Sequence, residues 1–238
     1  MPDLPALALP GFSEPFSSLS HLLAAGIVVV LGTVSLLRGG GVARTAGVGV
    51  FLVGAVFLLS MSGVYHLLEP GTTGRAVLQR LDHAAIFVLI AATFTPVHLL
   101  LFRGIARWGM LTLIWGSAIA GLTLKTIFFT QISEAVGVSL YLGLGWLGAF
   151  SGYLLYRRCG PRPLVPVIVG ALAYTTGAVL DFAGQSVLGV GAHESFHVLV
   201  LIGLGAHWRF IRAIARDPAA AAAHGPAPRR RFPASIPA

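Results

Sequence analysis

Residues 192–206 of the 238-residue chain read AHESFHVLVLIGLGA. His193 and His197 are four residues apart, so on a helix they share one face and lie one turn from each other, as two ligands of one metal ion can. All residues after His197 in this segment are apolar or glycine, which indicates that the pair opens a hydrophobic helix. The same string matches H-E-x-x-H, the zinc-protease pattern, so the rest of the chain must distinguish the two interpretations.

Composition points to a membrane protein rather than to an ordinary soluble domain. The chain is 56% hydrophobic and only 10% charged, with a mean hydropathy of +0.85, whereas soluble chains carry about 25% charged residues. Its formal net charge of +8 comes from basic residues in short clusters between apolar runs, a pattern that argues against nucleic-acid binding. The single cysteine, Cys159, excludes an intramolecular disulfide. Residues 1–15 are proline-rich and acidic and lack the basic start of a signal peptide.

Apolar runs recur along the chain, each long enough to cross a hydrocarbon core as a helix, which takes about 20 residues. Only helices can span here, because unpaired backbone groups in lipid are costly, and the short connections make successive helices neighbours. We therefore predict an all-α fold, a polytopic membrane protein with a seven-transmembrane-helix bundle at residues 19–213. An N-terminal segment (1–18) precedes the bundle, and a disordered basic tail (214–238) follows it. The predicted spans are 19–37, 46–68, 81–102, 108–129, 137–156, 164–184 and 193–213.

Polar residues of four spans are predicted to meet at one membrane face. Odd-numbered spans run in one direction and even-numbered spans in the other, so the starts of spans one, three and seven share a face with the end of span two. Ser20-His21, Ser62 with His66, Asp82-His83 and the histidine pair of span seven all lie there. Ionisable groups inside a membrane span are costly and commonly mark a functional site.

The histidines of this face suit a zinc site. Three neutral imidazoles, from His66, His193 and His197, leave the fourth position of a tetrahedral Zn²⁺ open, which is typical of catalytic zinc. Asp82 can act as a base or brace a ligand, and Ser62 can donate a hydrogen bond to a substrate oxygen.

Other ionisable residues receive separate predictions. His21 and His83 are at the correct face to brace a metal ligand. Asp181 lies at the same face, where a pairing or packing role is expected. Three further histidines are expected to be interfacial residues away from the cluster: His98, His207 and His224.

The chain resembles the hemolysin III proteins, bacterial members of the progestin and adiponectin receptor (PAQR) family. The matching motifs are Ser62-x-x-x-His66, Asp82-His83-Ala84-Ala85-Ile86-Phe87 and His193-x-x-x-His197, together with Glu14 and Ser20-His21. The resemblance covers residues 13–212 and implies that the three histidines bind zinc, with the serine and aspartate beside them. Because the wider superfamily includes alkaline ceramidases, it also implies a zinc-dependent lipid amidase or related hydrolase that acts on a membrane lipid.

Other functions remain open. The resemblance also implies a non-enzymatic regulator of membrane lipid composition, or a receptor, with structural zinc, and the hemolysin name implies pore formation. The open ligand position beside Asp82 favours an enzyme, whereas the spans lack the regular polar stripe of a lytic pore. A zinc protease needs a third ligand, and position 203, where one extended motif has histidine, is Gly203. Asp82 is preferred to Glu194 as the base.

Basic residues predict the orientation in the plasma (inner) membrane. Thirteen of the 16 Lys and Arg residues flank one face, and Arg75, Arg80 and Lys125 flank the other. The positive-inside rule then places the C-terminus in the cytoplasm and the N-terminus outside, so the zinc face is expected outside as well. The resemblance implies the opposite, since adiponectin receptors are thought to hold zinc near the cytoplasm.

Overall fold

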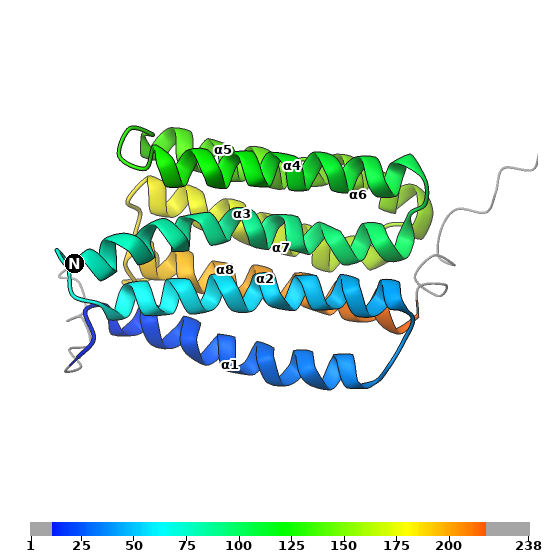
Figure 1. The fold of residues 1–238 in the computed structure, drawn as a ribbon, viewed down its shortest axis with the longest axis horizontal. Helices are drawn as coiled ribbons and strands as arrows, with labels where there is room; N and C mark the ends of the chain where they lie inside the picture. Colours follow the sequence, from blue (N-terminus) through cyan, green and yellow to red (C-terminus); the bar gives the residue numbers. More distant parts are fainter. Residues whose placement is uncertain (1–10, 218–238) are drawn as a thin grey trace, which may run out of the picture.

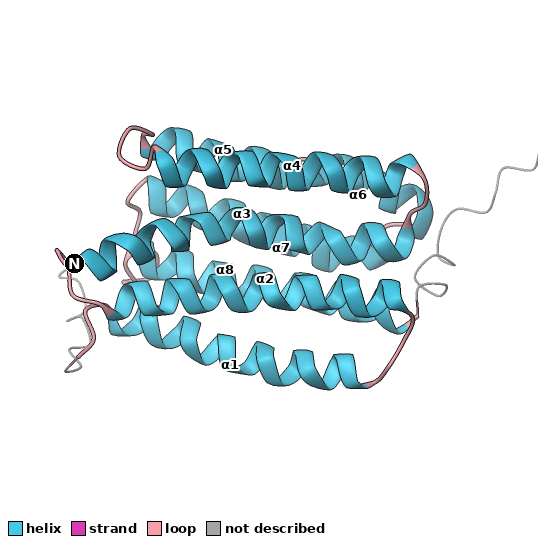
Figure 2. Ribbon diagram, viewed as in Figure 1, coloured by secondary structure: helices cyan, strands magenta, loops and turns pink. Residues whose placement is uncertain are grey.

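A computed structural model describes residues 11–217 of the chain as a bundle of antiparallel helices (Figure 1). Within these residues the structure has no β-strand beyond one isolated bridge between Val187 and Val190, as Figure 2 shows. The helices are α1 (Pro15–Leu37), α2 (Val42–Leu67), α3 (Thr73–Leu101), α4 (Ile105–Ile127), α5 (Glu134–Trp146), α6 (Gly148–Cys159), the 3-10 helix η1 (Arg162–Leu164), α7 (Val165–Phe182) and α8 (Ala192–Arg216).

The described residues form seven membrane spans, which confirms the predicted fold class. Each of α1, α2, α3, α4 and α8 is long and apolar enough to cross a membrane alone, and residues 134–159 and 162–182 supply the other two spans. Many large apolar side chains on the outside of the bundle are exposed, among them Leu23 and Val30 of α1. In water such a surface would be unfavourable, whereas in a multi-pass membrane protein it faces lipid.

The fifth span is interrupted at Leu147, between α5 and α6. The amide of Leu147 bonds to the carbonyl of Gly143 at 3.2 Å, so the chain continues in nearly the same direction. Glycines at 143, 145 and 148 surround the break, and glycine has a low helix propensity. The run 137–156 therefore crosses as predicted, but as two short helices.

The core lies where α2 packs between α1 and α3 and against α8. Its buried side chains include Phe51, Ala55 and Leu59 of α2 and Val200 and Leu204 of α8. The approach of α2 to α3 is close at Gly54, because a Cβ placed there would lie 2.6 Å from the Cβ of Ala92. Small residues allow helices in lipid to pack this closely.

The alternation of direction brings the starts of α1, α3, α5 and α8 to the same end of the bundle as the ends of α2, α4 and α7 (Figure 1). We call this the metal end, because it holds the residues predicted to form the zinc site. The first span begins at Pro15, so residues 15–18 of the predicted N-terminal segment are helical. At the other end α8 continues to Arg216, and most of the predicted disordered tail lies outside the described residues.

Candidate metal centre

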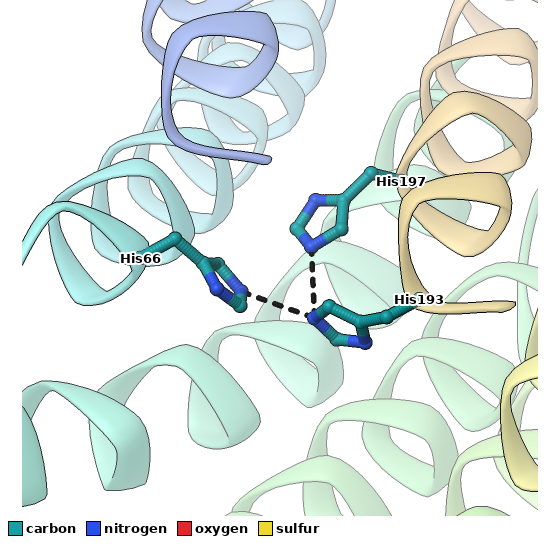
Figure 3. A group of neighbouring side chains, drawn as sticks. All are labelled: His66, His193 and His197. Carbon is teal, nitrogen blue, oxygen red and sulfur yellow. Dashed lines mark hydrogen bonds between the residues drawn. The ribbon is translucent and has the colours of Figure 1, made fainter. Parts of the chain in front are cut away.

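Three histidines from two helices converge at the metal end (Figure 3). His66 comes from the last turn of α2, and His193 and His197 come from the first turns of α8. The Nε2 atom of His193 lies 3.3 Å from Nε2 of His66 and 3.1 Å from Nε2 of His197. His66 and His197 are almost fully buried, while His193 is partly exposed and lines a cavity. The structure therefore brings together the three predicted ligands.

Each histidine is also held through its other ring nitrogen by a different partner. The Nδ1 atom of His66 lies 2.6 Å from Oε2 of Glu14, and Nδ1 of His193 lies 3.1 Å from Oδ1 of Asp181. The Nδ1 atom of His197 lies 2.9 Å from Nε2 of His21. Such contacts fix the ring orientation and the tautomer, and they leave the three Nε2 atoms facing one another.

Glu14 is fixed from several directions just before α1 begins. Its amide donates to the carbonyl of His66 at 3.1 Å, and its carboxylate forms an ion pair with Arg75. Arg75 in turn donates to the carbonyl of Leu68, just after the end of α2. The hydrogen bond from His66, followed by that from Arg75, lowers the pKa of Glu14 to about 2 against the opposing effect of partial burial. The carboxylate is therefore ionised at neutral pH and accepts a hydrogen bond from Nδ1–H of His66.

The donor set fits a metal ion. Carboxylate oxygens accept hydrogen bonds from Nδ1–H of His66 and of His193, so the Nε2 atom of each neutral ring carries a lone pair and no hydrogen. Two lone pairs facing each other at 3.3 Å repel, and a cation between them removes that repulsion. Zinc–nitrogen bonds of about 2.0–2.1 Å in a tetrahedron place ligand nitrogens about 3.3 Å apart, which agrees with the observed separations.

The metal end opens into a cavity of about 540 Å³ lined mostly by apolar side chains. Its lining extends along α8 from His193 to Ile211, which are separated by about 27 Å of helix at ~1.5 Å per residue. Asp82 of α3 and Ser62 of α2 lie beside each other in the same lining. A cavity of this volume is in the range of small-molecule sites. The two predicted catalytic residues thus share one space with the histidines.

The remaining candidates at this face separate into two groups. His21 and Asp181 contact metal-ligand candidates, as a bracing or pairing role requires. His83 instead bonds through Nδ1 to the carbonyl of Gln79 at 2.8 Å and packs on Phe129. Glu194 lies next to Gly191 and is not among the residues that line the cavity. Its position gives no support to the H-E-x-x-H protease interpretation.

The prediction of interfacial histidines was wrong at two positions. His98 is fully buried, its Nδ1 donates to the carbonyl of Ala106 at 2.8 Å, and its Nε2 accepts from Ser151 at 2.9 Å. His207 lines the cavity and contacts the carbonyl of Val167 at 3.2 Å. A position near the end of a span does not show which way the side chain points, and here both point inward. His224 lies outside the described residues.

Sequence reasoning assigned no role to Glu14, although the residue belongs to the matching motifs. It is one of only eight acidic side chains in the chain, and it comes directly before a span that starts at the metal end. The small number of acidic residues and the place of Glu14 just before the first span could have identified it as a partner for a histidine.

Comparison with known proteins agrees with this arrangement of motifs on seven spans. The sequence profile of proteins described as "Haemolysin-III related" matches residues 12–208. The chain belongs to the hemolysin III family. The predicted resemblance to hemolysin III and PAQR proteins is thereby confirmed.

Individual relatives come from bacteria and plants. "Hemolysin-3" of Bacillus cereus is 35% identical over 123 residues, which are 52% of this chain and 54% of the relative. "Hemolysin-3 homolog" of Bacillus subtilis (strain 168) is 29% identical over 130 residues, 55% of this chain and 60% of the relative. "Heptahelical transmembrane protein ADIPOR2" of Oryza sativa subsp. japonica is 29% identical over 183 residues, 67% of this chain and 77% of the relative. The chain thus spans somewhat more than half the length of the two bacterial relatives.

Proposed function

We propose that this chain is an integral membrane enzyme that uses a zinc ion to hydrolyse an amide or ester bond of a membrane lipid. The observation that carries the proposal is the position of three converging histidine nitrogens at one end of a long apolar cavity. Three protein ligands leave one position of a tetrahedral zinc ion for chemistry. The resemblance of the sequence motifs to a superfamily that includes alkaline ceramidases implies a lipid substrate as well.

Each side chain around the site has a separate role in this proposal. A zinc ion held there would polarise a substrate carbonyl and lower the pKa of water to about 7. Asp82 takes the proton from the attacking water, and Ser62 beside it donates a hydrogen bond to the oxyanion that develops on the substrate. The apolar remainder of the cavity holds the acyl chain and excludes bulk water.

The test is fatty-acid release by the purified protein. Zinc-loaded protein is incubated with a membrane lipid extract, with and without a chelator, and released fatty acid is followed by mass spectrometry. We expect release that the chelator abolishes. Asp82→Asn should keep much of the metal and lose most of the turnover, because the amide keeps the shape of the carboxylate and cannot act as the base. Ser62→Ala should slow turnover by on the order of tenfold to a thousandfold.

Glu194→Gln is the matched control, since this residue lies next to the histidines in sequence and outside the cavity lining. It should leave the rate unchanged. Equal release by zinc-loaded wild type and Asp82→Asn would remove Asp82 from the role of base. If wild type releases no fatty acid from any lipid class, the hydrolase proposal fails. The function would then be that of a regulator in which a structural metal ion ties α2 to α8.

A further inference from the structure

Lys125 is a buried cation in the wall of the cavity. It is the only lysine of the chain and lies near the end of α4, at the metal end. Its side chain is only 6% exposed, and it lines the same cavity as Asp82 and the histidines. A lysine that merely anchored α4 at the membrane surface would extend its ammonium group to water. Lys125 instead points inward.

The surroundings of Lys125 leave a defined place for its ammonium group. The Nζ atom lies 4.9 Å from the ring centroid of Phe129, and the same ring contacts His83 at 5.1 Å. A Cβ placed on Gly137 of α5 would lie 3.3 Å from Nζ. The absence of a side chain at Gly137 therefore gives the ammonium group its room between α4 and α5.

The ammonium group has no counter-ion of its own in residues 11–217. The ion pairs of this part of the chain involve Glu14 and Asp181, and none includes Lys125. Glu134 at the start of α5 also lines the cavity and acts on the lysine electrostatically, but the residue is exposed and forms no ion pair with Lys125. Buried lysines are almost always paired, because an isolated ammonium in a low-dielectric interior is costly. A ligand in the cavity can supply the missing anion.

We propose that Lys125 binds the negatively charged headgroup, a carboxylate or phosphate, of the lipid whose acyl chain occupies the cavity. Lys125 thereby selects anionic over neutral lipids. This inference rests on the part of the proposed function that places a lipid chain in the cavity, and it does not depend on hydrolysis. The cation and the three histidines lie at the same end of the cavity, so the charged group of the bound lipid is near the bond to be cleaved.

The test compares probes that share one chain and differ in charge. The full-length protein in phosphatidylcholine nanodiscs is titrated with hexadecyl phosphate, which is anionic, and with hexadecanol, which is neutral. Wild type should prefer hexadecyl phosphate by on the order of tenfold to a hundredfold, as expected for a charge-assisted contact. Lys125→Met should remove the preference and leave hexadecanol binding unchanged, and Lys125→Arg should retain it. Arg103→Met, an exposed cation at the opposite end, should behave as wild type.

Inorganic phosphate identifies the source of the anion. It carries the charge without the chain, so it should fail to compete at concentrations where hexadecyl phosphate saturates the site. Equal competition by inorganic phosphate would overturn the assignment to a lipid headgroup. Wild type that binds hexadecanol and hexadecyl phosphate equally would overturn the proposal without any variant. A preserved preference in a protein that releases no fatty acid would remove the hydrolase proposal and leave the role of Lys125 intact.

Discussion

The three histidines differ in what holds them, and this decides how each should respond to substitution. His66 is braced by Glu14 from the segment before α1, His193 by Asp181 at the end of α7, and His197 by His21 inside α1. Three elements that supply no ligand thus determine the direction of the ligand nitrogens. Contacts of the imidazole rings therefore join the starts of α1 and α8 to the ends of α2 and α7.

Removal of one ligand should empty the site. His66→Ala, His193→Ala and His197→Ala should each lose bound metal, as measured by elemental analysis of the purified protein against about one zinc per chain in wild type. Each should also lower the apparent melting temperature in detergent, because the ion ties α2 to α8. His98→Ala is the control, and it should lower the melting temperature through its two lost hydrogen bonds while keeping the metal. Full metal occupancy in a His66→Ala, His193→Ala double variant would contradict the assignment.

The bracing carboxylates should tune metal affinity without being ligands. Glu14→Gln and Asp181→Asn keep the shape of each side chain and remove the charge that holds an Nδ1 proton. We expect each to weaken metal affinity by about tenfold to a hundredfold, measured by competition with a chromophoric chelator. Glu69→Gln changes an exposed carboxylate near the same end and should have no effect. Unchanged affinity in both Glu14→Gln and Asp181→Asn would show that these contacts do not position the ligands.

The sequence was sufficient to bring the three candidate ligands to one end and to name His21 and Asp181 beside them, but not to assign a role to Glu14. The i, i+4 spacing of His193 and His197, together with the alternating direction of the spans, is enough to place His66 opposite them. The contacts of Glu14 and His21 depend on how α1 packs across the end of α2, which no local pattern encodes. The prediction that His98 is interfacial was wrong for a related reason. Whether its ring faces lipid or protein depends on its contacts with Ala106 of α4 and Ser151 of α6.

At the scale of elements, the spans were predictable because length and apolarity determine them. The break between α5 and α6 and the inward direction of Lys125 were not, since both depend on neighbouring helices. The contacts of Arg44 of α2 could not be predicted either, because they also depend on neighbouring helices. Its guanidinium donates hydrogen bonds to three carbonyls far from the metal end. They are those of Gly39, of Ser35 at 2.9 Å and of Ala215 at 3.0 Å. The last carbonyls of a helix have no partner within the helix, so Arg44 joins the ends of α1 and α8.

Loss of this contact should destabilise the bundle without affecting the metal centre. Arg44→Met should reduce the free energy of unfolding by about 1–3 kcal/mol, the range for hydrogen bonds to a charged group. The measurement is thermal unfolding in detergent, with metal content determined on the same samples. Arg38→Met, which changes an exposed side chain that forms no hydrogen bond to the described residues, should unfold as wild type does. Equal melting temperatures for Arg44→Met and Arg38→Met would mean that hydrogen bonds from water stabilise the three carbonyls as well as those from Arg44 do.

At the scale of the whole molecule, the two ends of the bundle differ in charge. The end opposite the metal centre carries Arg38, Arg103, Arg157, Arg158 and Arg162 on exposed positions. At the metal end Arg75 is paired with Glu14, Lys125 is buried, and Arg80 bonds to the carbonyl of Thr126 at 3.0 Å. The structure thus leaves the metal end with less free positive charge than a count of residues suggests.

This asymmetry leads to a prediction of orientation. Positive charge close to span ends favours the cytoplasmic side, so we expect the end of α8 in the cytoplasm and the metal centre at the outer face of the membrane. A C-terminal fusion to a reporter that fluoresces only in the cytoplasm should be fluorescent, and the same fusion to a reporter active only outside should be silent. Replacing Arg157, Arg158 and Arg162 together by Gln should weaken the bias and produce a mixed signal, whereas Arg75→Gln should not, because Glu14 already neutralises that charge. Activity of the external reporter alone would place the metal centre at the cytoplasmic face of the membrane. The acyl cavity and Lys125 would then meet substrate from the inner leaflet rather than from the outer one.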